Sequence, residues 1–459
     1  MAMTRKEGAE QPYIPLGVFK LRIPFIHYRF ESAEAIQACL MCATCLGAIP
    51  VLTQYLGVSY EVAWTMVIIN GCLYFLHASL GDPVVPGWIT PAIPVVLAYL
   101  SANYAMGPER IQAMVALQIM VGLIFFIMGI TGAANRLIRA IPMSIQAGIL
   151  LGAGIAAVVG EFARFSPDPS SPRFDTFRWS ITFSALLAYF VLFSETFKEM
   201  RRRNPTIDAL GKYGMLPAIV LGIIVGPIFG EISMPNVEIG TFFYIPDIQG
   251  MLNTVSPLRI GFPNFQMYLA AIPTAIAAYI IAFGDFVTTD ALIGGAAKTR
   301  PDEIVDFNPN RSNLISAIRN FIMAIVAPYT QLCGPLWAAV TASTAQRYKE
   351  GRTAMDSIFS GVGTFRMMTA IAVATIPIAT LVRPVLPVAL SVTLLVQGYI
   401  CAGLAVSMCK TDMDRCIAGV MGAVLACKGA AWGLGVGIAL HFLLSWNPLK
   451  SVSKATEAS

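Results

Sequence analysis

Apolar runs of about 20 residues recur along almost the whole chain, and this feature restricts its fold more than any other. A run of that length is what an α-helix needs to cross the hydrocarbon core of a bilayer. Of the 459 residues, 56% are hydrophobic and only 12% are charged, whereas a soluble domain carries about 25% charged residues. The sequence therefore predicts an all-α polytopic membrane protein without a sizeable soluble domain.

The apolar runs form two groups of seven, separated by a loop rich in proline and aromatic residues. In the first half we predict membrane segments at about 33–56, 60–80, 84–104, 109–132, 140–160, 177–198 and 213–231. In the second half we predict them at about 267–297, 312–327, 329–348, 366–382, 387–408, 414–427 and 429–446. An odd number of spans turns the second half upside down relative to the first. The expected architecture is therefore fourteen transmembrane segments in two inverted seven-helix repeats.

The third and tenth segments cannot be continuous helices, because several prolines and glycines interrupt them. The first break covers residues 81–91, with the sequence GDPVVPGWITP, and the second covers residues 326–337, with the sequence VAPYTQLCGPLW. In each segment we expect a short extended piece followed by a half-helix. The half-helices are predicted to begin at Thr90-Pro91 and at Gly334-Pro335, as N-cap and first-turn pairs.

The spacing of the two breaks and the distribution of charge support this layout. Pro91 and Pro335 are 244 residues apart, and two similar motifs end in prolines, Pro142 and Pro387, that are 245 apart. With both termini in the cytoplasm, about 23 of the 31 Lys and Arg residues fall on cytoplasmic segments. We expect an integral protein of a bacterial inner membrane, with cytoplasmic tails at 1–30 and 447–459.

In this layout the two half-helices point their N-termini at each other near the middle of the bilayer. A helix N-terminus offers unpaired N–H donors and a partial positive charge of roughly half a unit, which suits an anion. No acidic residue lies between Tyr329 and Gln346 to oppose one. The alternative is a pair of ordinary proline kinks in packed helices. The predicted substrate contacts from the breaks are Trp88, Ile89, Thr90, Pro91, Gln331, Cys333, Gly334 and Pro335.

Polar and aromatic side chains beside the breaks extend the predicted site. Gln37 and Thr44, on the first span, either contact substrate or form hydrogen bonds between helices. Trp88 and Trp337 flank the two breaks symmetrically, and either form the walls of a pocket or pack between helices. Three cysteines at spacings of three on the first span are interpreted as packing residues, because no metal-ligating partners are nearby.

Asp285 lies at membrane depth, where an acid is costly and usually functional. Thr289 follows four residues later on the same helical face. With carbonyl oxygens from Gln331–Gly334, the two side chains can form an oxygen cage for Na⁺. Alternatively, Asp285 alone carries a proton, or it is a structural acid. The predicted cation-coupling residues are Asp285, Thr289 and Gly334; beyond Na⁺ we predict no cofactor.

The remaining ionisable residues of the spans receive weaker assignments. Arg319 either pairs with Asp285 or Asp290, contacts an anion, or extends to the cytoplasmic face. Asp290 is expected to lie outside the substrate's direct contacts. The three histidines, His27, His77 and His441, are read as isolated and are given no role.

The seven-plus-seven layout with breaks in the third and tenth segments resembles the uracil permease fold, which nucleobase and ascorbate permeases, sulfate permeases and bicarbonate transporters share. The resemblance covers about residues 25–446. It implies a core domain (31–135 and 265–384), a gate domain (136–232 and 385–446) and an extracytoplasmic loop (233–264). It also implies elevator-like movement and a homodimer. The Asp285/Thr289 spacing is similar to the sodium site of cyanobacterial bicarbonate transporters.

Two functions follow from these patterns as expectations. The first is a secondary active transporter, not an enzyme, that moves a small anion such as a carboxylate, sulfonate or inorganic oxyanion with Na⁺ or H⁺. The alternative is a proton-coupled nucleobase permease of the uracil or xanthine type. Such permeases typically have an acid on the tenth span, where this chain offers Thr330, Gln331 and Cys333. The scattered basic residues form no face for nucleic acid, so the expected partners are a small anion, lipid and a second copy of the chain.

Overall fold

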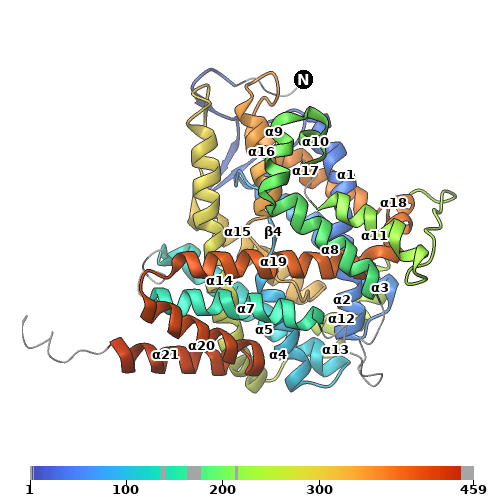
Figure 1. Cartoon of the computed structure of the whole chain (residues 1–459). Coiled ribbons are helices and arrows are strands. Elements are labelled where there is room, and N and C mark those ends of the chain that lie inside the picture. The colour runs from blue at the N-terminus through green and yellow to red at the C-terminus, as the bar shows by residue number, and fades with distance from the viewer. Residues whose placement is uncertain are drawn as a thin grey trace, which may run out of the picture.

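The computed structural model describes residues 3, 5–134, 136, 141–162, 177–211 and 215–445, and it is mostly helical (Figure 1). The predicted tail 447–459 lies outside the described residues.

The first half contains α1 (Ser32–Leu46), α2 (Ala48–Val51), the π-helix η1 (Leu52–Leu56), α3 (Tyr60–Ser79), the 3₁₀ helix η2 (Thr90–Ala92), α4 (Ile93–Asn103), α5 (Pro108–Thr131), α7 (Met143–Phe162), α8 (Arg178–Phe193), α9 (Glu195–Arg203), α10 (Pro205–Gly211) and α11 (Leu216–Ile228). The second half contains α12 (Ile248–Val255), α13 (Pro257–Ile260), α14 (Phe265–Ala297), α15 (Pro309–Val326), α16 (Ala338–Lys349), α17 (Ile358–Val373), α18 (Ile376–Val382), the 3₁₀ helix η4 (Arg383–Val385), α19 (Leu386–Met408), α20 (Asp412–Lys428) and α21 (Ala430–Ser445). The short strands are β1 (Ala9–Glu10), β2 (Ile14–Leu16), β3 (Phe19–Leu21), β4 (Gly87–Trp88), β5 (Glu303–Ile304) and β6 (Cys333–Gly334).

Within the described residues, six helical runs are long and apolar enough to cross a membrane. They are Ser32–Leu56, Tyr60–Ser79, Pro108–Thr131, Met143–Glu161, Phe265–Ala297 and Ile376–Met408. Helices α8 and α9 add a seventh if they count as one segment, although they meet at an angle of 63°. Several shorter apolar helices stand beside these runs. This pattern is that of an integral membrane protein, as the composition predicted.

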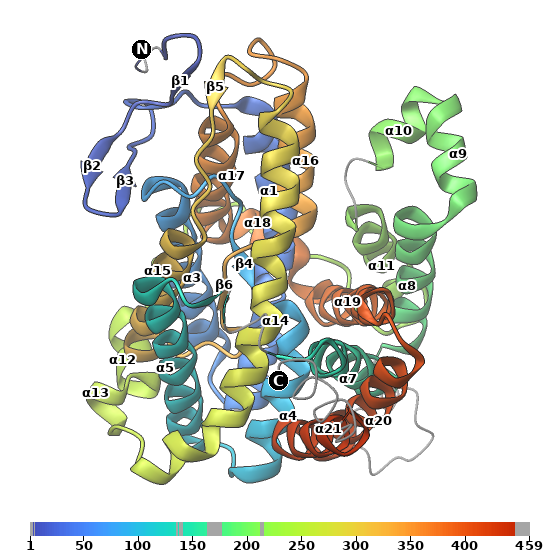
Figure 2. The same cartoon turned by 90° about the vertical axis from the view of Figure 1, so that its left-hand side faces the viewer.

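The helices form two bundles that stand side by side (Figure 2). In the first, which we call the core bundle, α1 and α3 pack on α17, and α5 packs on α14 and α15. In the second, the gate bundle, α7 packs on α19 and α20, and α8 packs on α11. The helices α4 and α16 that follow the two breaks belong to the core bundle, and α4 also contacts α7 across the interface.

Some predicted boundaries were wrong. The span predicted to start at residue 366 starts at Ile358, and it is split by a break between α17 and α18. The predicted boundary put Arg366 at the first position of the span, whereas this residue lies within α17 and its side chain is completely buried. The loop predicted at 233–264 contains the short helices α12 and α13.

The N-terminal residues predicted as a polar tail are folded against the core bundle. Strand β1 pairs in parallel with β5, and β2 and β3 form an antiparallel hairpin. Asp302, in the loop between α14 and α15, accepts hydrogen bonds from Arg5 Nη2 at 2.7 Å and from Arg300 Nε and Nη2. The ion pair and the strand pairing hold the N-terminal segment on the end of α14.

Replacing Asp302 by asparagine should lower the stability of this attachment. Hydrogen bonds from Arg300 and then from Arg5 lower the pKa of the Asp302 carboxyl to about 2. The ordinary value is about 3.9, so the stabilisation is complete above about pH 5 and is lost as the pH falls towards 2. We expect Asp302→Asn to lower the free energy of unfolding by about 1–2 kcal/mol at pH 7. Thermal unfolding in detergent measures this difference, and Asp412→Asn, which removes an exposed pair with Arg415, is the control that should change nothing.

Candidate substrate site at the two broken segments

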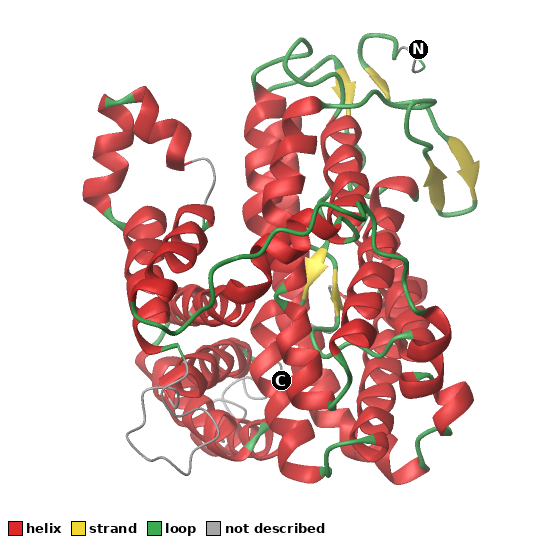
Figure 3. Cartoon of the chain, turned by 90° about the vertical axis from the view of Figure 1, so that its right-hand side faces the viewer, coloured by secondary structure: helices red, strands yellow, loops and turns green. Residues whose placement is uncertain are grey.

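The two broken segments meet in the middle of the core bundle. Strands β4 and β6 pair in an antiparallel register that places Gly87 opposite Gly334 and Trp88 opposite Cys333 (Figure 3). The Ile89 N–H extends the contact by donating to the Gln331 carbonyl at 3.2 Å. A half-helix follows each strand, as the sequence predicted. The pairing joins the two broken segments directly.

The first half-helix begins at Thr90, as predicted, but the second begins later than predicted. Helix α16 begins at Ala338 and not at Gly334-Pro335, because Gly334 belongs to β6 and the Trp337 N–H donates to the Val85 carbonyl at 2.7 Å. That bond keeps the intervening residues extended. Thr90 opens the short helix η2 without a side-chain cap, and α4 follows it at Ile93. Bonds between the two breaks therefore decide where the helices start.

Glycine is required where the two backbones approach each other. A Cβ atom on Gly334 would lie 2.7 Å from the Trp88 carbonyl carbon, and one on Gly87 would lie 2.8 Å from the Leu336 carbonyl oxygen. Both neighbours are backbone atoms, which cannot turn aside as a flexible side chain can. The strand pair therefore depends on the absence of side chains at these two positions.

Arg319, on α15, holds both strands. Its Nη1 donates to the Gly334 carbonyl at 2.9 Å, and its Nη2 donates to the Gly87 carbonyl at 3.3 Å. The side chain is completely buried, so it does not extend to the cytoplasmic face, and no ion pair with Asp285 or Asp290 forms among the described residues. The expectation of such a pair or extension was wrong, because carbonyl oxygens freed by the breaks are acceptors within reach.

His77 is not isolated, contrary to the sequence reading. Its Nδ1 lies 2.7 Å from an Asp82 carboxylate oxygen and its Nε2 lies 3.2 Å from Arg319 Nη1. Because an arginine can only donate, Nε2 accepts and the proton sits on Nδ1, which donates to Asp82. Ser312 also donates to Asp82, at 2.5 Å. Asp82 thus balances the charge of Arg319 through a neutral imidazole.

Amide side chains form hydrogen bonds with the backbone groups of the second break that have no partner within a helix. Asn320 accepts from the Cys333 N–H at 3.0 Å and donates to the Cys333 carbonyl at 2.9 Å. Gln118, on α5, accepts from the Tyr329 N–H at 2.8 Å. Neither residue was predicted from the sequence, although amides inside apolar spans are a signal that could have found them.

A cavity of about 70 Å³ lies beside the strand pair and faces the gate bundle. Thr44, Trp88, Thr90 and Trp337, which the sequence singled out, line it. The other lining residues are Cys45, Tyr74, Gly87, Leu336, Met215 and Thr393. Met215 and Thr393 come from the gate bundle side, and no sequence pattern marked them.

The other predicted contact residues do not line this cavity. Ile89, Gln331, Cys333, Gly334 and Pro335 are buried behind it. Pro91 is half-buried in η2, and Gln37 donates a hydrogen bond to Ser343 Oγ at 3.3 Å. That bond is the interhelical role that was the alternative for Gln37.

Buried hydrogen bond donors without a partner lie in the wall of the cavity and behind it. No lining residue is acidic. The Trp88 indole N–H is buried without a partner among the described residues, and so are all three guanidinium nitrogens of Arg366. Arg366 lies behind the wall, with its guanidinium carbon 4.0 Å from the centre of the Tyr74 ring and 5.1 Å from that of Trp337. A donor-rich site without acids favours an anion.

Asp285 lies on α14 next to residues that line a second hollow between the bundles, but it does not line the hollow itself. Its neighbours Gly284 and Thr288 line a cavity of about 570 Å³ that α14 shares with α7 and α19. Asp285 has no hydrogen bond partner among the described residues, and Thr289 is buried. The Gly334 carbonyl accepts from Arg319. The grouping of Asp285, Thr289 and Gly334 around Na⁺ stays a prediction.

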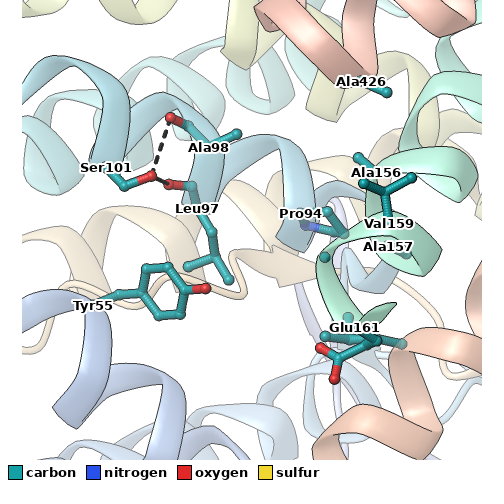
Figure 4. A pocket seen from close by; sticks show the side chains of 12 residues that line it. Tyr55, Pro94, Leu97, Ala98, Ser101, Ala156, Ala157, Val159, Glu161 and Ala426 are labelled. Atoms are coloured by element: carbon teal, nitrogen blue, oxygen red, sulfur yellow. Dashed lines mark hydrogen bonds between the residues drawn. The ribbon is translucent and has the colours of Figure 1, made fainter. Parts of the chain in front are cut away.

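A third hollow of about 260 Å³ follows α4 along the same interface (Figure 4). Tyr55 and Glu161 extend into it from facing elements, and Ser101 Oγ donates to the Leu97 carbonyl at 2.8 Å. A small apolar cluster lies between the bundles at this level, formed by Val51, Ile93, Leu97, Ala157, Leu390 and Leu394. Trp88 packs against this cluster. The cluster therefore stands next to the 70 Å³ cavity.

Comparison with known proteins gives structural matches only. No protein-family model and no curated protein matches the sequence. The transmembrane domain of a cyanobacterium bicarbonate transporter, BicA, matches with a TM-score of 0.50 and 15% identity, covering 90% of this chain and 99% of that one. SLC26A9 matches with a TM-score of 0.54 and 13% identity, covering 90% of this chain and 65% of that one. The murine Slc26a9 anion transporter in the inward-facing state matches at 0.52 and 14%, covering 90% and 67%.

These identities are low, so the likeness concerns the fold. The chain spans about two thirds of the length of the two SLC26A9 structures and nearly all of the BicA domain. Bicarbonate transporters and sulfate permeases belong to the group that the broken third and tenth segments resemble. The chain therefore has the membrane fold of these transporters, the uracil permease fold that its sequence resembles.

Proposed function

We propose that the protein is a secondary active transporter of the elevator type, which moves a small anion together with Na⁺ or H⁺. The observation that carries this proposal is the cavity beside the strand pair, where two half-helices begin, where no lining residue is acidic and where the Trp88 N–H has no partner among the described residues. Anion transporters among the structures with this fold support it.

The lining of the cavity limits the substrate. The cavity is small, at about 70 Å³, and no lining residue is acidic. An anion of a few heavy atoms, such as a small carboxylate, sulfonate or inorganic oxyanion, suits such a lining. The acid that would hydrogen-bond a nucleobase is not among the lining residues.

The interface between the bundles provides the surface for movement. Residues of both bundles line the cavity, and the apolar cluster around Leu97 and Leu394 closes the interface next to it. An apolar contact of this kind can slide without breaking hydrogen bonds. In our proposal the core bundle carries the anion past the gate bundle of a homodimer, with both termini in the cytoplasm.

Asp285 is the proposed binding site of the coupling cation. A carboxylate inside a membrane segment that has no hydrogen bond among the described residues is costly unless a cation or proton neutralises it. Its neighbours Gly284 and Thr288 line the 570 Å³ hollow, which brings a cavity within one residue of the carboxylate along α14. Thr289, one turn further along α14, is the proposed second ligand if the cation is Na⁺.

Uptake by proteoliposomes tests the proposed function. Labelled bicarbonate, sulfate, formate and uracil are supplied separately, with a Na⁺ gradient, with a pH gradient, or with neither. We expect uptake of at least one of the anions, and we expect one of the gradients to increase it. Uptake of uracil driven by pH alone, with none of the anions transported, would overturn the proposal in favour of a nucleobase permease.

A further inference from the structure

Arg366 is a buried cation that no acid balances. It lies on α17, eight residues after the first residue of that helix, and it is completely buried. None of its guanidinium nitrogens has a nitrogen or oxygen partner among the described residues, and the Cys45 thiol is the polar group that it contacts. The other buried arginines of the described chain all donate hydrogen bonds, as Arg22 does to Glu10 and Arg319 to Gly334.

The neighbours of Arg366 are walls of the 70 Å³ cavity. Its guanidinium stacks on Tyr74 at 4.0 Å and approaches Trp337 at 5.1 Å, measured to the ring centres. Cys45, which also lines the cavity, is the polar group beside it. One layer of side chains therefore separates the positive charge from the cavity proposed for the substrate. In a buried, weakly polarisable environment a charge acts strongly over that distance.

The acid in this region, Asp82, contacts the other buried arginine through His77. Its Oδ2 accepts from His77 and Ser312, its Oδ1 has no partner among the described residues, and through the neutral His77 it balances Arg319. Among the described residues no ion pair reaches Arg366, so it is the cation left over at the centre of the core bundle. A buried charge without a counter-charge is strongly destabilising, and such residues in membrane segments usually serve function.

We propose that Arg366 supplies the full positive charge of the anion site and so makes the site select an anion over a neutral molecule. The inference rests on the proposed function. The half-helix ends contribute only partial charges, whereas Arg366 contributes a whole one. The bound anion is its counter-charge. When the site is occupied, the core bundle therefore carries no unbalanced charge.

Anion-dependent thermal stabilisation of the purified, full-length protein tests the proposal. The probes are potassium sulfate, bicarbonate and formate, each compared with potassium gluconate at equal ionic strength. The variants are Arg366→Gln, Arg366→Lys and the control Arg383→Gln, which removes an exposed arginine that also stacks on a tyrosine, Tyr60. We expect Arg366→Gln to raise the anion concentration for half-maximal stabilisation at least about tenfold. Arg366→Lys keeps the positive charge but not the stacking on Tyr74, so it should lose less than Arg366→Gln. The control should stay within about threefold of wild type.

The unfolding temperature without anion separates charge from packing. If Arg366 carries an unbalanced charge, Arg366→Gln should unfold at the same or a higher temperature than wild type without anion. A lower temperature, together with unchanged anion stabilisation, would mean that Arg366 serves packing only and would overturn the inference while the proposed function stands. If wild type responds to none of the three anions but is stabilised by uracil, the proposed function and the inference both fail.

Discussion

Replacing Gly334 by alanine should reduce uptake to background. The new Cβ atom would lie 2.7 Å from the Trp88 carbonyl carbon, 2.8 Å from the Trp88 oxygen and 2.9 Å from the Ile89 nitrogen. All three are backbone atoms on the opposite strand, so the strand pair must separate. Overpacking of this kind lowers the stability by about 1–3 kcal/mol. Here it disturbs the strand pair, which positions the N-terminal ends of both half-helices. Proteoliposome uptake of the anion found for wild type measures the effect.

Two further glycine variants make this result specific. Gly87→Ala should behave like Gly334→Ala, because its Cβ would meet the Leu336 carbonyl oxygen at 2.8 Å. Gly403→Ala, on α19, is the control, because a Cβ there meets nothing within 4 Å, and alanine favours a helix. Normal uptake by Gly334→Ala, in protein that elutes and unfolds like wild type, would show that transport does not need the close strand pair.

Replacing Asp285 by asparagine should abolish gradient-driven uptake while leaving anion binding intact. The amide has nearly the volume of the carboxyl group but cannot bind Na⁺ with a charge or take up a proton at neutral pH. We expect uptake driven by a Na⁺ or pH gradient to fall at least about tenfold, which corresponds to the loss of one charge-assisted interaction. Stabilisation by the anion should persist, because the cavity beside the strand pair does not include Asp285.

Asp290→Asn is the matched control on the same helix. Asp290 is exposed and lies five residues further along α14, so its loss should leave coupled uptake within about twofold of wild type, as expected for a surface charge. Wild-type coupling in Asp285→Asn would remove that residue from the proposed mechanism. Equal losses in both variants would point to a general effect of charge on α14 and not to a cation site.

Local signals were sufficient to predict the membrane class and the two breaks. The apolar runs follow from the length that a helix needs to cross lipid, and the breaks follow from proline and glycine, which cannot continue a helix. Helix starts were predicted less well. Thr90-Pro91 and Gly334-Pro335 match capping preferences, yet the structure starts α16 at Ala338 because the Trp337 N–H bonds to Val85, far away in the sequence.

Most contacts of the buried polar residues in the core bundle could not be predicted from the sequence. Arg366 was read as the edge of a span, Arg319 was given three alternatives, and His77 was read as isolated. Each side chain is defined by groups from another part of the chain: Arg366 by Tyr74 and Trp337, Arg319 by the strand carbonyls, and His77 by Arg319 and Asp82. Spacing along one helix carries no information about such partners.

The sequence by itself determined that this chain lies in a membrane, where it is broken, and which short stretches lack acids, because these properties depend on hydrophobicity and backbone geometry of neighbouring residues. Only the tertiary structure decided that the two breaks pair strand to strand, that Arg319 holds them, and that Arg366 is left without an acid. Those facts depend on contacts between residues hundreds of positions apart, which bring charges and freed backbone groups together in one buried place.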